Sequence, residues 1–217
     1  MIIPPINIVK EYSGSQDADN YVLVGKIFAD KFRPFIQPGD RVLEVGCGCA
    51  RIAQALESFN IRYDGFDVVK EAIDWCQTLR IPDFNFRWVD LYNSQYNPSG
   101  KTPASEFIFP YADHSFDFVF LTSVFTHVQP EVVQHYISQI KRVLKPDKYC
   151  LATFFLVEDG KRERSDWKWH KRDDFWIVDP GKPDAIVGYE EAWVRNLMPV
   201  EKIDFCFQDT VLYRNAV

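Results

Sequence analysis

The 217-residue chain lacks several features that mark other classes of protein. It has no run of about 18 apolar residues, so no membrane-spanning helix is expected. Residues 1–7 lack a basic segment followed by an apolar one, so no secretory signal is expected. An excess of basic residues is also absent. With a formal net charge of −6, neither nucleic acid nor an anionic membrane is expected as a partner.

Cysteine is scarce, and its number is odd. Four of the five cysteines (Cys47, Cys49, Cys76 and Cys150) fall inside predicted turn, helix or strand segments. This pattern favours free thiols in a reducing cytoplasm over a disulfide framework. The pair Cys47 and Cys49 has no second pair of ligands nearby, so no metal site is expected.

Apolar and aromatic side chains, in contrast, are abundant. Hydrophobic residues make up 47% of the chain and aromatic residues 16%, which suffices for a full core and leaves rings to line a pocket. The length suits one sizeable α/β domain and is short for two. We therefore expect a single domain over residues 1–217.

Apolar runs and helical stripes alternate through the middle of the chain. The helix expected from Pro130 has apolar residues at Val133, Ile137, Ile140 and Leu144, and residues 145–147 are expected to end it. This alternation predicts an α/β fold with three layers and a doubly wound, mostly parallel sheet. Two closing strands with a very short turn are expected to pair antiparallel. The predicted strands are 41–45, 61–67, 84–89, 116–121, 149–156, 202–207 and 210–214.

The flanking segments are less regular. Residues 1–16 are expected to be irregular, and residues 92–100 to form a polar loop. After residues 1–16, a helix capped by Asp17 or Asp19 is expected, with the apolar residues Val24, Ile27, Phe28 and Phe32 on one face. Residues 158–188 are charged and rich in tryptophan. They predict a solvated connection whose rings dock on the core, or alternatively a surface that attracts an anionic or planar ligand. A helix is expected at 189–197.

The most informative segment is 42–51, which reads VLEVGCGCAR. It predicts a buried strand, a glycine turn and the start of a helix, and Asp67 ends the next strand about 20 residues further on. Small residues let the backbone approach a ligand, and a carboxylate at this position accepts hydrogen bonds from two ribose hydroxyls. The segment therefore predicts a site for a ligand that contains adenosine.

The glycine pattern separates two classes of ligand. A dinucleotide site requires G-x-G-x-x-G, whereas this chain has Glu44, Gly46, Gly48 and Ala50 at alternate positions. Here the chain resembles the S-adenosylmethionine-dependent methyltransferases with the seven-stranded Rossmann-like fold, and only the last glycine of their motif is replaced, by alanine. The resemblance covers about residues 40–155. It includes YDGFDV at 63–68, DL at 90–91, FPYADHSFDFV at 109–119 and RVLKP at 142–146.

This resemblance implies S-adenosylmethionine as the cofactor and a Rossmann-like, three-layer sheet whose last strand is antiparallel. For the adenosine half, it implies that Asp67 accepts both ribose hydroxyls and that Asp90 accepts the exocyclic amine of adenine. Val68 and Leu91 would contact the two faces of the adenine ring.

For the methionine half, the resemblance implies that Gly46, Cys47 and Gly48 run beneath the homocysteine part. Glu44 would bind the amino group, directly or through water. Ser123, or a nearby backbone carbonyl after the fourth strand, would face the methionine portion.

The resemblance also implies an activity, methyl transfer to an oxygen or nitrogen of a small-molecule acceptor. His127, one turn beyond the fourth strand, is the candidate base for a hydroxyl acceptor, or else it orders the turn at 126–130. The expected parts are an N-terminal helical lid (1–39), a cofactor-binding core (40–156), a substrate-side insert and helix (157–200) and closing strands (201–217).

Two alternatives to this enzyme remain open. One is a non-catalytic partner protein that keeps the S-adenosylmethionine site. The other is a nicotinamide-dependent oxidoreductase, which the glycine pattern and the lack of a Tyr-x-x-x-Lys pair after the fourth strand disfavour. We expect a monomer or a homodimer.

Overall fold

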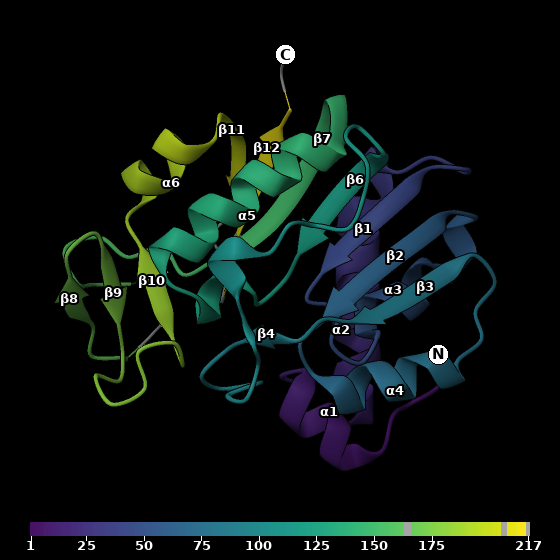
Figure 1. Ribbon diagram of the computed structural model, residues 1–217, viewed down its shortest axis with the longest axis horizontal. Helices are drawn as coiled ribbons and strands as arrows, with labels where there is room; N and C mark the ends of the chain where they lie inside the picture. The colour runs from purple at the N-terminus through teal and green to yellow at the C-terminus, as the bar shows by residue number, and fades with distance from the viewer. Residues whose placement is uncertain (163–165, 205–207, 216–217) are drawn as a thin grey trace.

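The computed structural model describes residues 1–162, 166–204 and 208–215. Its main feature is a sheet of seven strands: β1 (Arg41–Val45), β2 (Arg62–Asp67), β3 (Phe84–Trp88), β6 (Phe116–Leu121), β7 (Leu144–Phe154), β11 (Val200–Asp204) and β12 (Asp209–Arg214). Their order across the sheet is β11-β12-β7-β6-β1-β2-β3 (Figure 1). The strands from β7 to β3 pair in parallel, and β12 pairs antiparallel with both neighbours. The predicted three-layer, Rossmann-like α/β fold is confirmed.

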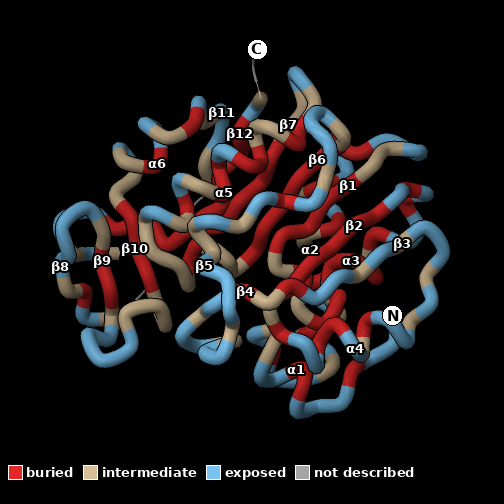
Figure 2. Tube along the Cα trace, in the orientation of Figure 1, coloured by how far each residue is buried: buried red, intermediate tan, exposed pale blue. Residues whose placement is uncertain are grey.

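Both faces of this sheet are covered by helices, because its central strands bury side chains alternately on either side. In β1, Val42 packs with α2 (Ala18–Phe32), α3 (Arg51–Leu56) and α4 (Lys70–Thr78). Leu43 and Val45 pack on the other face with α5 (Pro130–Val143) and α6 (Glu191–Leu197). Figure 2 shows the resulting buried layer along the sheet. Burial on both faces explains why these strands read as continuous apolar runs.

Helix α5 begins as predicted, with Pro130 in its first turn, and its stripe of Val133, Ile137 and Ile140 is buried. Its predicted end at residues 145–147 is wrong. The helix ends at Val143, and β7 begins directly at Leu144, which pairs with Phe116 of β6. The turn-forming residues 145–147 therefore lie inside the first part of β7.

The N-terminal segment is more ordered than predicted. Residues 1–16, expected to be irregular, contain α1 (Ile6–Tyr12), whose Ile8 and Val9 are buried in one cluster with Val69 and Ala72. This segment therefore packs against the region around α4 rather than forming a loose arm.

Helix α2 is capped by Asp17, whose carboxylate accepts the N–H of Asn20 at 2.8 Å. The predicted apolar face is only partly buried, because Ile27 is 46% exposed. The helix buries Gly25 and Ala29 instead. A Cβ at Gly25 would lie 2.5 Å from the carbonyl oxygen of Arg51, so α2 approaches α3 through its small residues.

The segment 158–188, predicted as a solvated connection, contains a second sheet. Strands β8 (His170–Arg172), β9 (Phe175–Ile177) and β10 (Val187–Tyr189) pair antiparallel. Trp169 and Trp176 are buried beside Phe155, as the predicted docking of rings requires. Because residue 189 belongs to β10, α6 begins at Glu191 rather than at 189. Residues 163–165 lie outside the described part of the chain.

Shorter elements complete the fold. The polar loop after β3 is framed by β4 (Leu91–Tyr92) and β5 (Thr102–Pro103), which pair in parallel. Strands β11 and β12 pair antiparallel, as predicted, and residues 205–207 of the predicted strand lie outside the described residues. Among the described helices, none is both long and apolar enough to cross a membrane. The 3-10 helices are η1 (Arg33–Phe35), η2 (Glu57–Phe59), η3 (Ala104–Glu106) and η4 (Phe125–His127).

Candidate functional site

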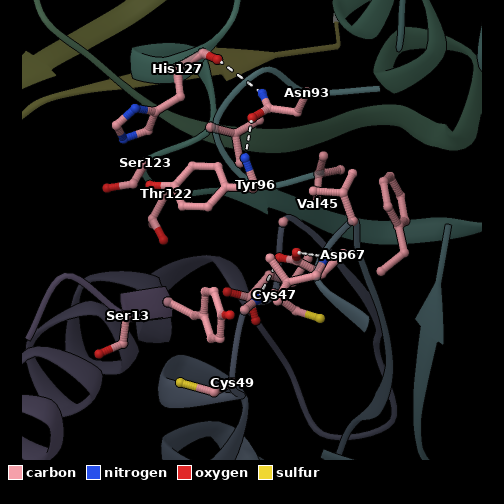
Figure 3. Close-up of a pocket in the computed structure, with 18 of the residues that line it drawn as sticks. Ser13, Val45, Cys47, Cys49, Asp67, Asn93, Tyr96, Thr122, Ser123 and His127 are labelled. Atoms are coloured by element: carbon pink, nitrogen blue, oxygen red, sulfur yellow. Dashed lines mark hydrogen bonds between the residues drawn. The ribbon is translucent and has the colours of Figure 1, made fainter. Parts of the chain in front are cut away.

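A cavity opens at the carboxyl ends of β1, β2 and β6, where the strand order reverses between β1 and β6. This is the position at which open α/β sheets bind their ligands. Its wall comes mainly from residues 12–14, 44–52, 66–69, 92–96 and 122–128. In the view of Figure 3, Asp67 and Cys47 lie on one side, and His127 and Asn93 lie on the other.

The glycine turn between β1 and α3 is tightly enclosed on both sides. Gly46 and Gly48 adopt positive φ angles of 74° and 49°. A Cβ at Gly46 would overlap the side chain of Val124, and one at Gly48 would lie 2.9 Å from the carbonyl oxygen of Tyr12. Only glycine fits here, so the backbone itself, together with the buried Cys47, forms this part of the wall.

Asp67, at the end of β2, holds the turn in place. Its Oδ2 accepts the N–H of Gly48 at 2.7 Å, and its Oδ1 accepts the N–H of Val69 at 2.8 Å. Burial raises the pKa of the carboxyl group, and the backbone donors partly oppose this. Each oxygen keeps a second lone pair for a ligand, so the position suits the predicted contact with ribose hydroxyls. Val68, the next residue, also lines the cavity.

Glu44, near the end of β1, is only 2% exposed. Its Oε2 accepts the hydroxyl of Tyr63 at 2.5 Å. Burial raises the pKa of Glu44 to about 8, while the Tyr63 hydrogen bond and the charge of Arg51 lower it. A cationic group bound in the cavity would stabilise the ionised form, as the predicted contact with an amino group requires.

Tyr63 was not identified from the sequence as a site residue. It reaches Glu44 because Gly65, which pairs with Glu44 in the sheet, has no side chain. A Cβ at Gly65 would lie 2.5 Å from the Tyr63 hydroxyl. The glycine inside the predicted strand 61–67 was the available signal.

The N-terminal segment closes one side of the cavity through Tyr12, Ser13 and Gly14. Arg51, the first residue of α3, fastens it: Nη1 donates to the carbonyl oxygen of Ser13 and to Oγ of Ser15. Burial lowers the pKa of this guanidinium. The predicted lid is thus in contact with the glycine turn in this structure.

Two predicted cofactor residues, Asp90 and Leu91, are not brought into the cavity wall. Leu91 is buried in the hydrophobic core. Asp90 accepts the side-chain N–H of Asn97 at 3.3 Å, and its carbonyl oxygen accepts the N–H of Thr102. The main chain turns into β4 directly after Asp90, and residues of the following loop line the cavity in their place.

His127, at the end of η4, does line the cavity. Its Nδ1 lies 2.7 Å from the carbonyl oxygen of Ala185. Because a carbonyl only accepts, Nδ1 carries the proton, and Nε2 of the neutral ring is free to accept one. Burial lowers the pKa of His127 and favours the neutral ring, while the backbone hydrogen bonds to Ala185 and Asp184 and the charge of Asp184 partly oppose this. The ring of Tyr96 meets it edge-on at 5.6 Å.

Ser123, after β6, lines the cavity with a positive φ of 59°. Its N–H donates to Oγ1 of Thr153 at 2.8 Å, and its hydroxyl accepts from the side chain of Gln208 at 2.5 Å. Thr153 of β7 and Gln208, just before β12, therefore fix the position of this residue in the wall.

Asp184 joins the 158–188 segment to the cavity. Its carboxylate accepts the hydroxyl of Ser94 at 2.5 Å and the side-chain N–H of Gln129 at 3.0 Å. Asn93 donates to the carbonyl oxygen of His127 at 3.3 Å. The turn next to Ala185, the loop after β4 and the start of α5 are thus held together around His127.

Comparisons with known proteins agree with this geometry. Residues 43–152, just over half of the chain, match the family model described as a methyltransferase domain. An S-adenosylmethionine-dependent methyltransferase from Methanosarcina mazei is 20% identical, with a TM-score of 0.60, over 86% of this chain and 97% of its own. One from Aquifex aeolicus is 15% identical, with a TM-score of 0.63, over 95% of this chain and 97% of its own.

A third solved structure contains ligands. It is the 1,6-didemethyltoxoflavin-N1-methyltransferase of Burkholderia thailandensis, with 1,6-didemethyltoxoflavin and S-adenosylhomocysteine bound. It is 14% identical, with a TM-score of 0.62, over 97% of this chain and 86% of its own. At these identities the likeness shows the shared fold.

The family match and the shared fold together identify the class of protein. The chain belongs to the class I S-adenosylmethionine-dependent methyltransferase family, and S-adenosylmethionine is its cofactor.

Proposed function

We propose that this protein transfers a methyl group from S-adenosylmethionine to an oxygen or nitrogen of a small-molecule acceptor. The observation that carries the proposal is one cavity that brings together the glycine turn, the carboxylate of Asp67 and the neutral ring of His127. The loop at 92–96 and the segment at 12–14 also line this cavity, which suits a small acceptor better than a polymer.

The cofactor contacts follow from the positions of the side chains. We propose that Asp67 holds the ribose, that Val68 contacts the adenine, and that Glu44 holds the amino group. Gly46, Cys47, Gly48 and Ser123 would line the methionine end. When bound, S-adenosylmethionine supplies a methyl carbon on a positively charged sulfur, which keeps the electron pair of the broken bond.

The remaining task of the protein is to align the acceptor and exclude water. A hydroxyl acceptor must also lose its proton as its oxygen bonds to the methyl carbon. We propose that Nε2 of His127 accepts this proton, because Nδ1 is already committed to Ala185. A nitrogen acceptor with a free lone pair would not need this step.

A cytoplasmic location is also part of the proposal. Cys47, Cys49, Cys76 and Cys150 are buried free thiols, as expected in a reducing compartment, while Cys206 lies outside the described residues.

Calorimetric titration with S-adenosylhomocysteine and with NADH tests the cofactor site. We expect binding of the first only, and binding of NADH alone would instead favour the oxidoreductase. A screen for methyl transfer to small acceptors then separates the enzyme from a non-catalytic binding protein. With a hydroxyl acceptor, His127→Ala should lower kcat, and a pH–rate profile that stays flat through the imidazole range would remove the base role.

A further inference from the structure

Part of the cavity wall is aromatic. Tyr96, His127 and Tyr136 line it. Tyr96 packs partly against the N-terminal cluster that includes Ile8 and Val9, and its ring also meets His127 edge-on. In Figure 3 its ring lies between the labelled groups of the two sides. Rings that enclose a cavity in this way favour a planar, largely apolar occupant.

Two hydroxyls in this wall are available to a ligand. Within the described part of the chain, neither the Tyr96 nor the Tyr136 hydroxyl has a hydrogen-bond partner, and Tyr136 is only 4% exposed. Neither oxygen is among the fully buried polar atoms without a partner, so both hydroxyls open onto the cavity and can bond a polar atom of a bound molecule. Burial and the charge of Asp67 raise the pKa of each tyrosine, which keeps both hydroxyls protonated.

The charges of the wall exclude one class of acceptor. Its carboxyl groups belong to Glu44 and Asp67. Of the described lining residues, Arg51 is the one with a permanent positive charge, and its guanidinium donates to Ser13 and Ser15. A phosphate or carboxylate near His127 would therefore be buried without a cationic partner, which is costly.

We infer that the acceptor is a compact, uncharged, planar ring compound with a hydroxyl or N–H group directed at His127, and that anionic acceptors are rejected. This inference rests on the proposed function, because it assigns the acceptor of the same site. Tyr96 and Tyr136 would hold the polar atoms of the ring compound, and the aromatic wall would hold its faces.

The test uses the chain of residues 1–217 saturated with S-adenosylhomocysteine. Ligand-observed NMR would screen a set of small hydroxylated and nitrogen-containing rings, each neutral member paired with the same ring carrying a carboxylate or phosphate. We expect neutral members to bind at least about tenfold more tightly than their anionic partners. Tyr136→Phe should weaken the neutral ligands about three- to tenfold, whereas Tyr149→Phe, at a ring that packs on another core cluster and does not line the cavity, should leave them unchanged.

Two outcomes would overturn the inference: anionic members that bind as tightly as their neutral partners, or the failure of every neutral ring to bind at millimolar concentration. If S-adenosylhomocysteine itself fails to bind, the proposed function fails first. If it binds and neutral rings do not, only the acceptor assignment fails.

Discussion

The two sides of the cavity are built in different ways. On the cofactor side, the wall is mostly main chain: positive φ angles at Gly46 and Gly48, and backbone N–H groups bonded to Asp67. On the acceptor side, side chains join segments far apart in sequence, as Asp184 does with Ser94 and Gln129.

This difference indicates which side of the cavity tolerates substitutions. Main-chain geometry fixed by glycines tolerates little substitution, so the cofactor side is constrained by its own sequence. Hydrogen bonds between surface segments can be exchanged more freely, so the acceptor side can vary while the cofactor site stays intact.

The largest effect is expected from Glu44 on the cofactor side. Burial raises its pKa from 4.5 to about 8, so between these values the folded protein keeps a proton that the unfolded chain has released. The contribution of Glu44 to the free energy of unfolding should therefore be largest below about pH 4.5 and fall as the pH rises to about 8. At about 1.4 kcal/mol per pKa unit, the contribution is on the order of 5 kcal/mol.

Urea unfolding at several pH values, for the wild type and Glu44→Gln, measures this contribution. Glutamine still accepts a hydrogen bond from the Tyr63 hydroxyl but does not titrate. The free energy of unfolding of the variant should therefore lack the decrease with pH that comes from Glu44. If the free energy of unfolding changed with pH in the same way in both proteins, a buried, protonated Glu44 would be contradicted.

A substitution in the glycine turn should show the rigidity of the cofactor side. Gly46→Ala combines a positive φ with overlap of Val124 and should lower the free energy of unfolding by about 2–4 kcal/mol. Gly39→Ala is the matched control, since its φ is also positive but nothing lies within 4 Å of a Cβ there. If urea unfolding showed the same loss of unfolding free energy in both variants, the turn would not be tightly enclosed.

Asp67→Ala should weaken S-adenosylhomocysteine binding by about 1.5–3 kcal/mol, the value of hydrogen bonds to a charged group. In calorimetry this is a roughly 10- to 150-fold rise in Kd. Asp90→Ala removes a carboxylate that does not line the cavity, so it should change Kd by less than about twofold. A larger loss at Asp90 than at Asp67 would restore the role predicted for Asp90 and refute the geometry described above.

The smallest effect is expected on the acceptor side. Asp184→Ala removes the two hydrogen bonds to Ser94 and Gln129 and should lower the free energy of unfolding by about 1 kcal/mol. Binding of S-adenosylhomocysteine should stay within about twofold of wild type, because the cofactor side does not depend on this contact. A loss as large as that of Asp67→Ala would show that the two sides are coupled.

The difference between the two sides of the cavity also explains which parts of the fold and of the site could be predicted from the sequence. The central strands, helix α5 and the positions of Glu44, Asp67 and His127 follow from local patterns, because burial on a parallel sheet and turns at strand ends leave local signals.

Features that depend on distant contacts were missed. The contact of Ala185 with His127 spans 58 residues and leaves no local pattern. Helix α1 is short and depends on packing for its stability. The placement of Asp90 and Leu91 depends on pairing between β4 and β5, which the polar loop did not reveal.

A crystal structure of the complex with S-adenosylhomocysteine tests the central claim most directly. We expect both ribose hydroxyls within hydrogen-bond distance of the Asp67 carboxylate, and the amino group beside Glu44. A ribose bound away from Asp67, or a ligand outside the cavity at the ends of β1, β2 and β6, would contradict the account.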